Sequence, residues 1–114
     1  MTELLSEIAL EKQYKTFRDF YPYYLSEHTN FICRTLHFIG SSLVLAAMAM
    51  ALITGNAWWF AAMPLAGYGF AWVGHFFFEK NRPATFTYPL YSFAGDWVMY
   101  FQLLVGKIKF NARG

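Results

Sequence analysis

The chain has 114 residues, of which 57% are hydrophobic, 22% are aromatic and only 14% are charged, and its formal net charge is +2. Soluble domains usually carry charge on about 25% of their residues, so the composition indicates one membrane domain over residues 1–114. The low net charge excludes a basic nucleic-acid-binding protein. The hydrophobicity excludes a disordered chain, and the single cysteine, Cys33, excludes a disulfide scaffold.

The N-terminal segment is predicted to form an amphipathic helix over residues 3–20. Leu4, Ile8, Tyr14 and Phe17 lie on one face at helical spacing, which is typical of a helix in the membrane interface. We expect Pro22 to end this helix.

The middle of the chain is free of charge, because no charged side chain lies between Arg34 and Glu79. This run is long enough for two spans of about 20 residues and a turn. Turn-forming residues at 54–57 divide it, which predicts spans over residues 36–54 and 58–79. Small residues four apart, such as Ala47 and Ala51, favour close helix packing. Lysines and arginines flank both outer ends of the hairpin, so the positive-inside rule predicts cytoplasmic termini.

The C-terminal region is predicted to hold a loop over residues 81–89 and a helix over residues 96–106, capped by Asp96. That helix is too short to span a membrane. A third span over residues 84–105 is the alternative, and it would place Pro89 and Asp96 inside the bilayer. The predicted fold class is an all-α membrane protein, a transmembrane helical hairpin with an N-terminal amphipathic helix and a C-terminal interfacial or re-entrant helix.

The three histidines are His28, His37 and His75. Folding the hairpin at residues 55–56 brings His37 and His75 to one depth. On one continuous helix His28 would face away from His37, so we expect the polar residues 26–30 to break the helix and return His28 to the others. Glu79 follows His75 by four residues and shares its helix face.

Two histidines and a carboxylate around open coordination positions are typical of non-haem Fe(II) oxygenases. The spacing leaves a zinc site, a proton relay and a plain hydrogen-bond network as alternatives. A catalytic triad is not indicated, because no acid accompanies Cys33 or Ser41 beside His37.

Four stretches resemble a known family: FYPYYLSEH at residues 20–28, RTLHFIG at 34–40, GHFFFEKNRPA at 74–84, and Gly95-Asp96. The family is a group of small membrane proteins long known only as a domain of unknown function, and the resemblance covers about residues 15–105. It includes an endoplasmic-reticulum Fe(II)-dependent dioxygenase that shortens 2-hydroxy fatty acids by one carbon in phytosphingosine breakdown. The resemblance implies that His28, His37 and His75 bind Fe(II).

The leading hypothesis is therefore an Fe(II)-dependent dioxygenase that uses O2 to shorten a 2-hydroxy fatty acid or a similar hydroxylated lipid. Glu79 is assigned as a further ligand or as the partner that orients His75, and Asp96 as a further acidic group. Arg34 and Arg82 are assigned to the substrate carboxylate, with headgroup contact as their alternative role.

The compact form of the chain, with its short turn and tails, favours a bacterial inner-membrane protein. Two spans enclose little lipid alone, so a homo-oligomer is expected. The rival functions are a non-enzymatic membrane scaffold or lipid-binding protein, and a zinc-dependent lipid hydrolase.

Overall fold

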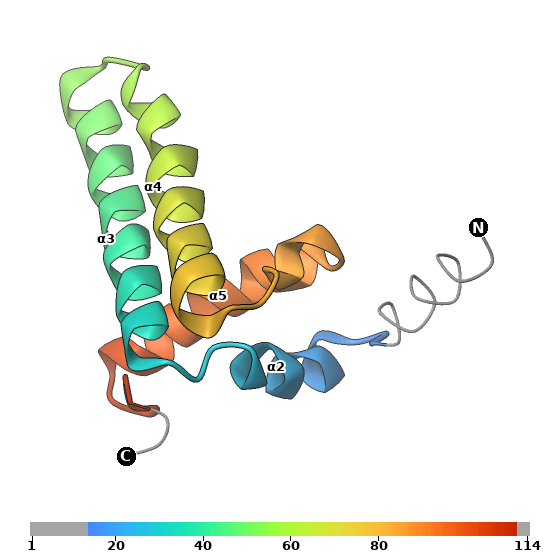
Figure 1. Cartoon of the computed structure of the whole chain (residues 1–114). Coiled ribbons are helices and arrows are strands. Elements are labelled where there is room, and N and C mark those ends of the chain that lie inside the picture. The colour runs from blue at the N-terminus through green and yellow to red at the C-terminus, as the bar shows by residue number, and fades with distance from the viewer. Residues whose placement is uncertain (1–13, 112–114) are drawn as a thin grey trace.

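The computed structural model describes residues 14–111, and all regular elements in this range are helical. They are α2 (Phe17–Ser26), α3 (Phe31–Thr54), α4 (Trp59–Val73), a π-helical turn η1 (Gly74–Glu79), a 3-10 turn η2 (Ala84–Phe86) and α5 (Pro89–Leu104). α3 runs up and α4 with η1 runs back down, and this hairpin stands on a base formed by α2 and α5 (Figure 1). The predicted all-α class is confirmed.

The hairpin turns at Gly55, as the sequence indicates. Gly55 ends α3 in the left-handed conformation with φ 70°, and its N–H donates to the carbonyl of Ala51 at 3.0 Å, which is a common way for a helix to end. Lower down, the two arms approach closely at Gly40, where an added Cβ would lie 2.9 Å from the carbonyl oxygen of Ala66. Only a glycine permits this backbone approach.

α3 has 24 residues and is the helix in residues 14–111 that is long and apolar enough to cross a membrane. Only 22% of its most apolar stretch is buried inside the protein. At the tip of the hairpin Ile53 is 78% exposed and Trp58 is 82% exposed. The arms therefore present apolar side chains outward instead of enclosing them.

The base has a conventional core of aromatic and aliphatic side chains. Its buried members are Phe20, Tyr24, Ala84, Tyr88, Met99 and Leu103. α2 lies close against α5, because an added Cβ on Gly95 would come within 3.0 Å of the Tyr24 ring. This core joins segments from both ends of the described chain.

The N-terminal helix differs from the predicted one. Residues 3–13 lie outside the described residues, and α2 starts at Phe17 and continues through Pro22 to Ser26. A proline inside a helix costs about 3 kcal/mol. Phe20 and Tyr24 lie one turn apart on either side of it and are 0% and 1% exposed, and burying each large side chain contributes roughly 1.5–3 kcal/mol. Tertiary burial thus outweighs the local break.

Two other helices begin earlier than predicted. α3 begins at Phe31, because the Asn30 side chain accepts hydrogen bonds from the N–H groups of Ile32 and Cys33 at 2.8 and 3.2 Å. α5 begins at Pro89, a residue suited to the first helical position. The prediction that Asp96 caps a helix is wrong, since Asp96 lies in the middle of α5.

Candidate metal centre

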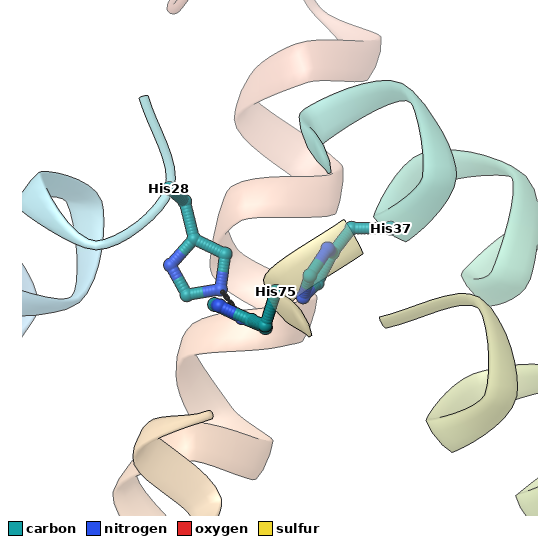
Figure 2. A group of neighbouring side chains, drawn as sticks. All are labelled: His28, His37 and His75. Atoms are coloured by element: carbon teal, nitrogen blue, oxygen red, sulfur yellow. Dashed lines mark hydrogen bonds between the residues drawn. The ribbon is translucent and has the colours of Figure 1, made fainter. Parts of the chain in front are cut away.

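Three histidines from separate segments meet at the junction of the hairpin and the base. His28 comes from the loop between α2 and α3, His37 from α3 and His75 from η1 (Figure 2). One ring nitrogen from each lies within 4.8 Å of the other two. The side chains are 1%, 6% and 2% exposed, respectively. All three histidines are therefore shielded from solvent.

Hydrogen bonds fix the orientation of all three rings. Nδ1 of His28 lies 2.6 Å from the carbonyl oxygen of Tyr24, Nδ1 of His37 lies 3.0 Å from that of Cys33, and Nδ1 of His75 lies 2.6 Å from Oδ1 of Asn81. Each partner atom is an acceptor, so each Nδ1 carries the proton. The Nε2 atoms then keep their lone pairs, which is the tautomer that a metal requires.

The Nε2 atoms of His28 and His75 are only 2.7 Å apart (Figure 2). With both Nδ1 atoms protonated, these two nitrogens direct lone pairs at each other, and a bound cation would relieve the repulsion. A proton is a poor candidate because burial lowers the pKa of His28 well below its ordinary value. Three neutral imidazoles around one point fit a divalent metal such as iron or zinc.

The loop that carries His28 is held from two sides. The Glu79 carboxylate accepts a hydrogen bond from the backbone N–H of Asn30 and another from the Thr29 hydroxyl. Arg34 donates to the carbonyl of His28 and, at 2.6 Å, to the carbonyl of Lys109. Glu79 and Arg34 therefore fix the break in the chain that returns His28 to the other histidines.

The residue that orients His75 is Asn81, in the place for which the sequence suggested Glu79. The π-helical turn ends at Lys80, whose φ of 57° turns the chain back, and the N–H of Asn81 donates to the carbonyl of His75 at 3.0 Å. Nδ2 of Asn81 also donates to Oε2 of Glu27 at 2.7 Å. A π turn needs more residues per turn than an α-helix, so the i+4 face assumed for Glu79 does not apply.

A small cavity adjoins the triad and brings in two polar residues of α5. Ser92 and Asp96 line it together with the three histidines. The Tyr24 hydroxyl donates to the Asp96 carboxylate, and burial raises the pKa of Asp96 to about 7. The Ser92 hydroxyl is buried and has no hydrogen-bond partner among residues 14–111.

Arg82 lies beside a different cavity from the one that adjoins the triad. It lines a separate cavity of about 300 Å³ with Glu27, donates to the Thr87 hydroxyl at 3.3 Å and lies 5.7 Å from the centre of the Phe86 ring. Arg82 does not line the cavity beside the histidines.

Sequence reasoning missed Asn81 and Ser92. Asn81 follows His75 by six residues, a separation that an α-helix does not place on one face. Ser92 precedes Asp96 by four residues, so a helix predicted from Pro89 would have put both on one face.

A family model described as "2-hydroxy-palmitic acid dioxygenase Mpo1-like" matches residues 14–108. The match includes all three histidines, Asn81, Ser92 and Asp96. No curated protein and no solved structure matches the chain.

Proposed function

The chain belongs to the Mpo1-like family of 2-hydroxy-palmitic acid dioxygenases, and on this premise we propose that it is an Fe(II)-dependent dioxygenase that shortens a 2-hydroxy fatty acid by one carbon. The observation that carries the proposal is the convergence of three buried imidazoles, each with an acceptor at Nδ1 that leaves its Nε2 free to bind a metal. Bound Fe(II) would leave open positions for O2 and for the oxygens of the substrate.

The proposed reaction balances with O2 as the only co-substrate. The bond between C1 and C2 of the 2-hydroxy acid breaks, C1 leaves as CO2, and C2 becomes the carboxyl carbon of the shortened acid. The acid loses four electrons and O2 gains four, and one water is formed. No further reductant is needed.

Ser92 and Asp96 are proposed to contact the polar end of the substrate, Ser92 through a hydrogen bond and Asp96 through a proton exchange. An unpaired buried hydroxyl costs roughly 1–3 kcal/mol, and a substrate carboxylate or 2-hydroxyl in the cavity would give Ser92 the missing partner. Asp96, whose pKa is about 7, is suited to exchange a proton with the 2-hydroxyl at neutral pH. Glu79 and Arg34 support the His28 loop instead of contacting the substrate.

The protein is proposed to be integral to the membrane, with α3 and the run from α4 through η1 as its two spans and both termini in the cytoplasm. The length of α3 and its outward apolar side chains support this. The metal centre would then lie near the cytoplasmic interface, where a fatty acid keeps its carboxylate. A bacterial inner membrane is the proposed setting, and a homo-oligomer the proposed assembly.

Oxygen uptake tests the function. Protein purified without oxygen, reconstituted with Fe(II) and desalted, is expected to keep one iron per chain and to consume O2 with 2-hydroxypalmitate, yielding pentadecanoate. Ser92→Ala should lower kcat/KM roughly 10-fold or more, as expected when a hydrogen bond to a charged group, worth about 1.5–3 kcal/mol, is lost. Its thermal stability should hold, because the hydroxyl has no partner to lose. Iron-loaded protein that consumes no O2 would refute the proposal.

A zinc-dependent lipid hydrolase is the second candidate, because three imidazoles with an open fourth position also occur at catalytic zinc. Zinc-loaded protein that hydrolyses lipid esters without O2, while iron-loaded protein takes up none, would favour it. A lipid-binding protein would return the 2-hydroxy acid unchanged with either metal.

A further inference from the structure

An apolar groove begins beside the triad and runs up the hairpin. It has a volume of about 220 Å³ and is bounded by α3, α4 and α5. On α3 its lining residues are His37, Ser41 and Val44, which follow one face of the helix. On α4 they include Met63, Gly67 and Ala71, which also recur on one face.

The groove adjoins the small cavity that holds the histidines. His37, Tyr68, Ala71, Thr85 and Asp96 line both. A molecule whose polar end lies against Ser92 and Asp96 can therefore extend directly into the groove.

Polarity divides the groove along its length. His37, Ser41 and Asp96 lie at the end near the triad, whereas Val44, Met63 and Pro64 form the far end. A ligand that matches this pattern has one polar head and one apolar tail. The residues at the far end offer no side chain that could bind a second polar or charged group of the ligand.

We propose that this groove binds the alkyl chain next to the head group of the 2-hydroxy acid, and that Met63 and Val44 determine how well long chains are accepted. This inference rests on the proposed function, because the head group is placed at the triad. The chain would run from the metal centre towards the middle of the bilayer, the direction in which a fatty acid already lies.

The dimensions agree with part of an acyl chain. From His37 to Val44 the helix rises on the order of 10 Å, at about 1.5 Å per residue. An apolar cavity of roughly 150 Å³ can hold benzene, so 220 Å³ has room for more than six carbons of a chain. The remaining carbons of a long acid would leave the groove and enter the lipid.

Met63→Trp tests the inference by filling the far end of the groove. Oxygen uptake and product formation are measured with 2-hydroxyoctanoate, 2-hydroxydodecanoate and 2-hydroxypalmitate. The variant is expected to lose at least 10-fold in kcat/KM for 2-hydroxypalmitate and to keep wild-type kcat/KM for 2-hydroxyoctanoate. Val44→Phe fills the same end from the opposite helix and should give the same profile.

Leu65→Trp is the matched control. Leu65 also lies on α4 but is 75% exposed and does not line the groove, so its profile should match the wild type. Iron content and far-ultraviolet circular dichroism show whether each variant is folded. An unchanged profile in both folded groove variants, or an equal loss for all three acids, would overturn the inference.

A binding measurement separates this inference from the function itself. Zinc-loaded protein in lipid nanodiscs is titrated with a fluorescent fatty acid, which each 2-hydroxy acid then displaces. Met63→Trp should weaken displacement by 2-hydroxypalmitate at least 10-fold and leave 2-hydroxyoctanoate unchanged. This result would support the groove even if iron-loaded protein consumed no O2. If Met63→Trp changed the oligomeric mass of the protein but not the displacement by any 2-hydroxy acid, the groove would be a contact with a second copy of the chain and the inference would be overturned.

Discussion

The base and the distal half of the hairpin are organised in different ways. The base, α2 and α5, together with the His28 loop, η1 and the lower end of α3, buries aromatic rings and the three histidines, each of which is held by a hydrogen bond. The distal half, residues 44–65, makes its helix contacts through small residues such as Ala47 and Ala51, and α4 has no buried residue at all. A buried polar cluster needs rigid support on every side, whereas arms with outward apolar side chains need only close backbone packing.

The largest expected effect is on the metal centre, where the hairpin meets the base. His37→Ala removes one of three proposed ligands, so bound iron and O2 uptake should fall to background, a greater loss than the roughly 10–100-fold typical of residues that merely orient a ligand. Iron content after desalting and the oxygen electrode measure both. Glu79→Gln is the matched control and should keep its iron, because Glu79 contacts Asn30 and Thr29. Iron loss in Glu79→Gln with retention in His37→Ala would reverse the ligand assignment.

A second change tests the support of the base. Asn81→Ala removes the acceptor at Nδ1 of His75 and should weaken metal affinity roughly 10–100-fold, measured by competition with a chelator. Glu27→Gln alters the outer contact to Asn81 and leaves the contact between Asn81 and His75 in place, so it should have a smaller effect. Equal effects of the two variants would show that the direct hydrogen bond from His75 to Asn81 matters no more than the outer one from Asn81 to Glu27.

The third change addresses the hairpin. Gly40→Ala places a methyl group 2.9 Å from the Ala66 carbonyl oxygen, and such overpacking costs roughly 1–3 kcal/mol. Gly69→Ala, on the open side of α4 with no atom within 4 Å, should be neutral or stabilising by up to about 1 kcal/mol, since alanine favours helices. Thermal unfolding in one detergent compares them, and a lower Tm for Gly69→Ala than for Gly40→Ala would show that the arms do not meet as described.

The most gradual effect is a pH dependence at the base, which is spread over several pH units. Burial raises the pKa of Asp96 from 3.8 to about 7, so the folded protein keeps a proton that the unfolded chain releases. The stability that this contributes is complete below about pH 4 and is lost as the pH rises through 7, with a slope of at most about 1.4 kcal/mol per pH unit. The three histidines are common to both proteins, so this decline should appear as a fall with rising pH in the difference between the unfolding free energies of metal-free wild type and Asp96→Asn. Parallel curves would mean that another group titrates.

Much of the hairpin was predictable from local sequence. The charge-free run, the turn at Gly55 and the small residues of α3 act over a few neighbouring positions, and the structure places them as expected. Placing His37 and His75 at one depth needed only the fold-back of two helices. The predictions that Pro22 ends a helix and that Asp96 begins one failed because both rest on local signals. Burial of Phe20 and Tyr24 carries α2 through Pro22. α5 begins at Pro89, which leaves Asp96 in its middle.

The sequence by itself determined the helical class, the hairpin and the three histidines, because composition, periodicity and the family motif lie along the chain. Only the tertiary structure decided which groups orient the histidines, that Asn81 and not Glu79 holds His75, and that Ser92 and Asp96 share the cavity. Those contacts join residues from α2, η1 and α5, and they depend on a π turn and a left-handed residue, Lys80, that no helical period predicts.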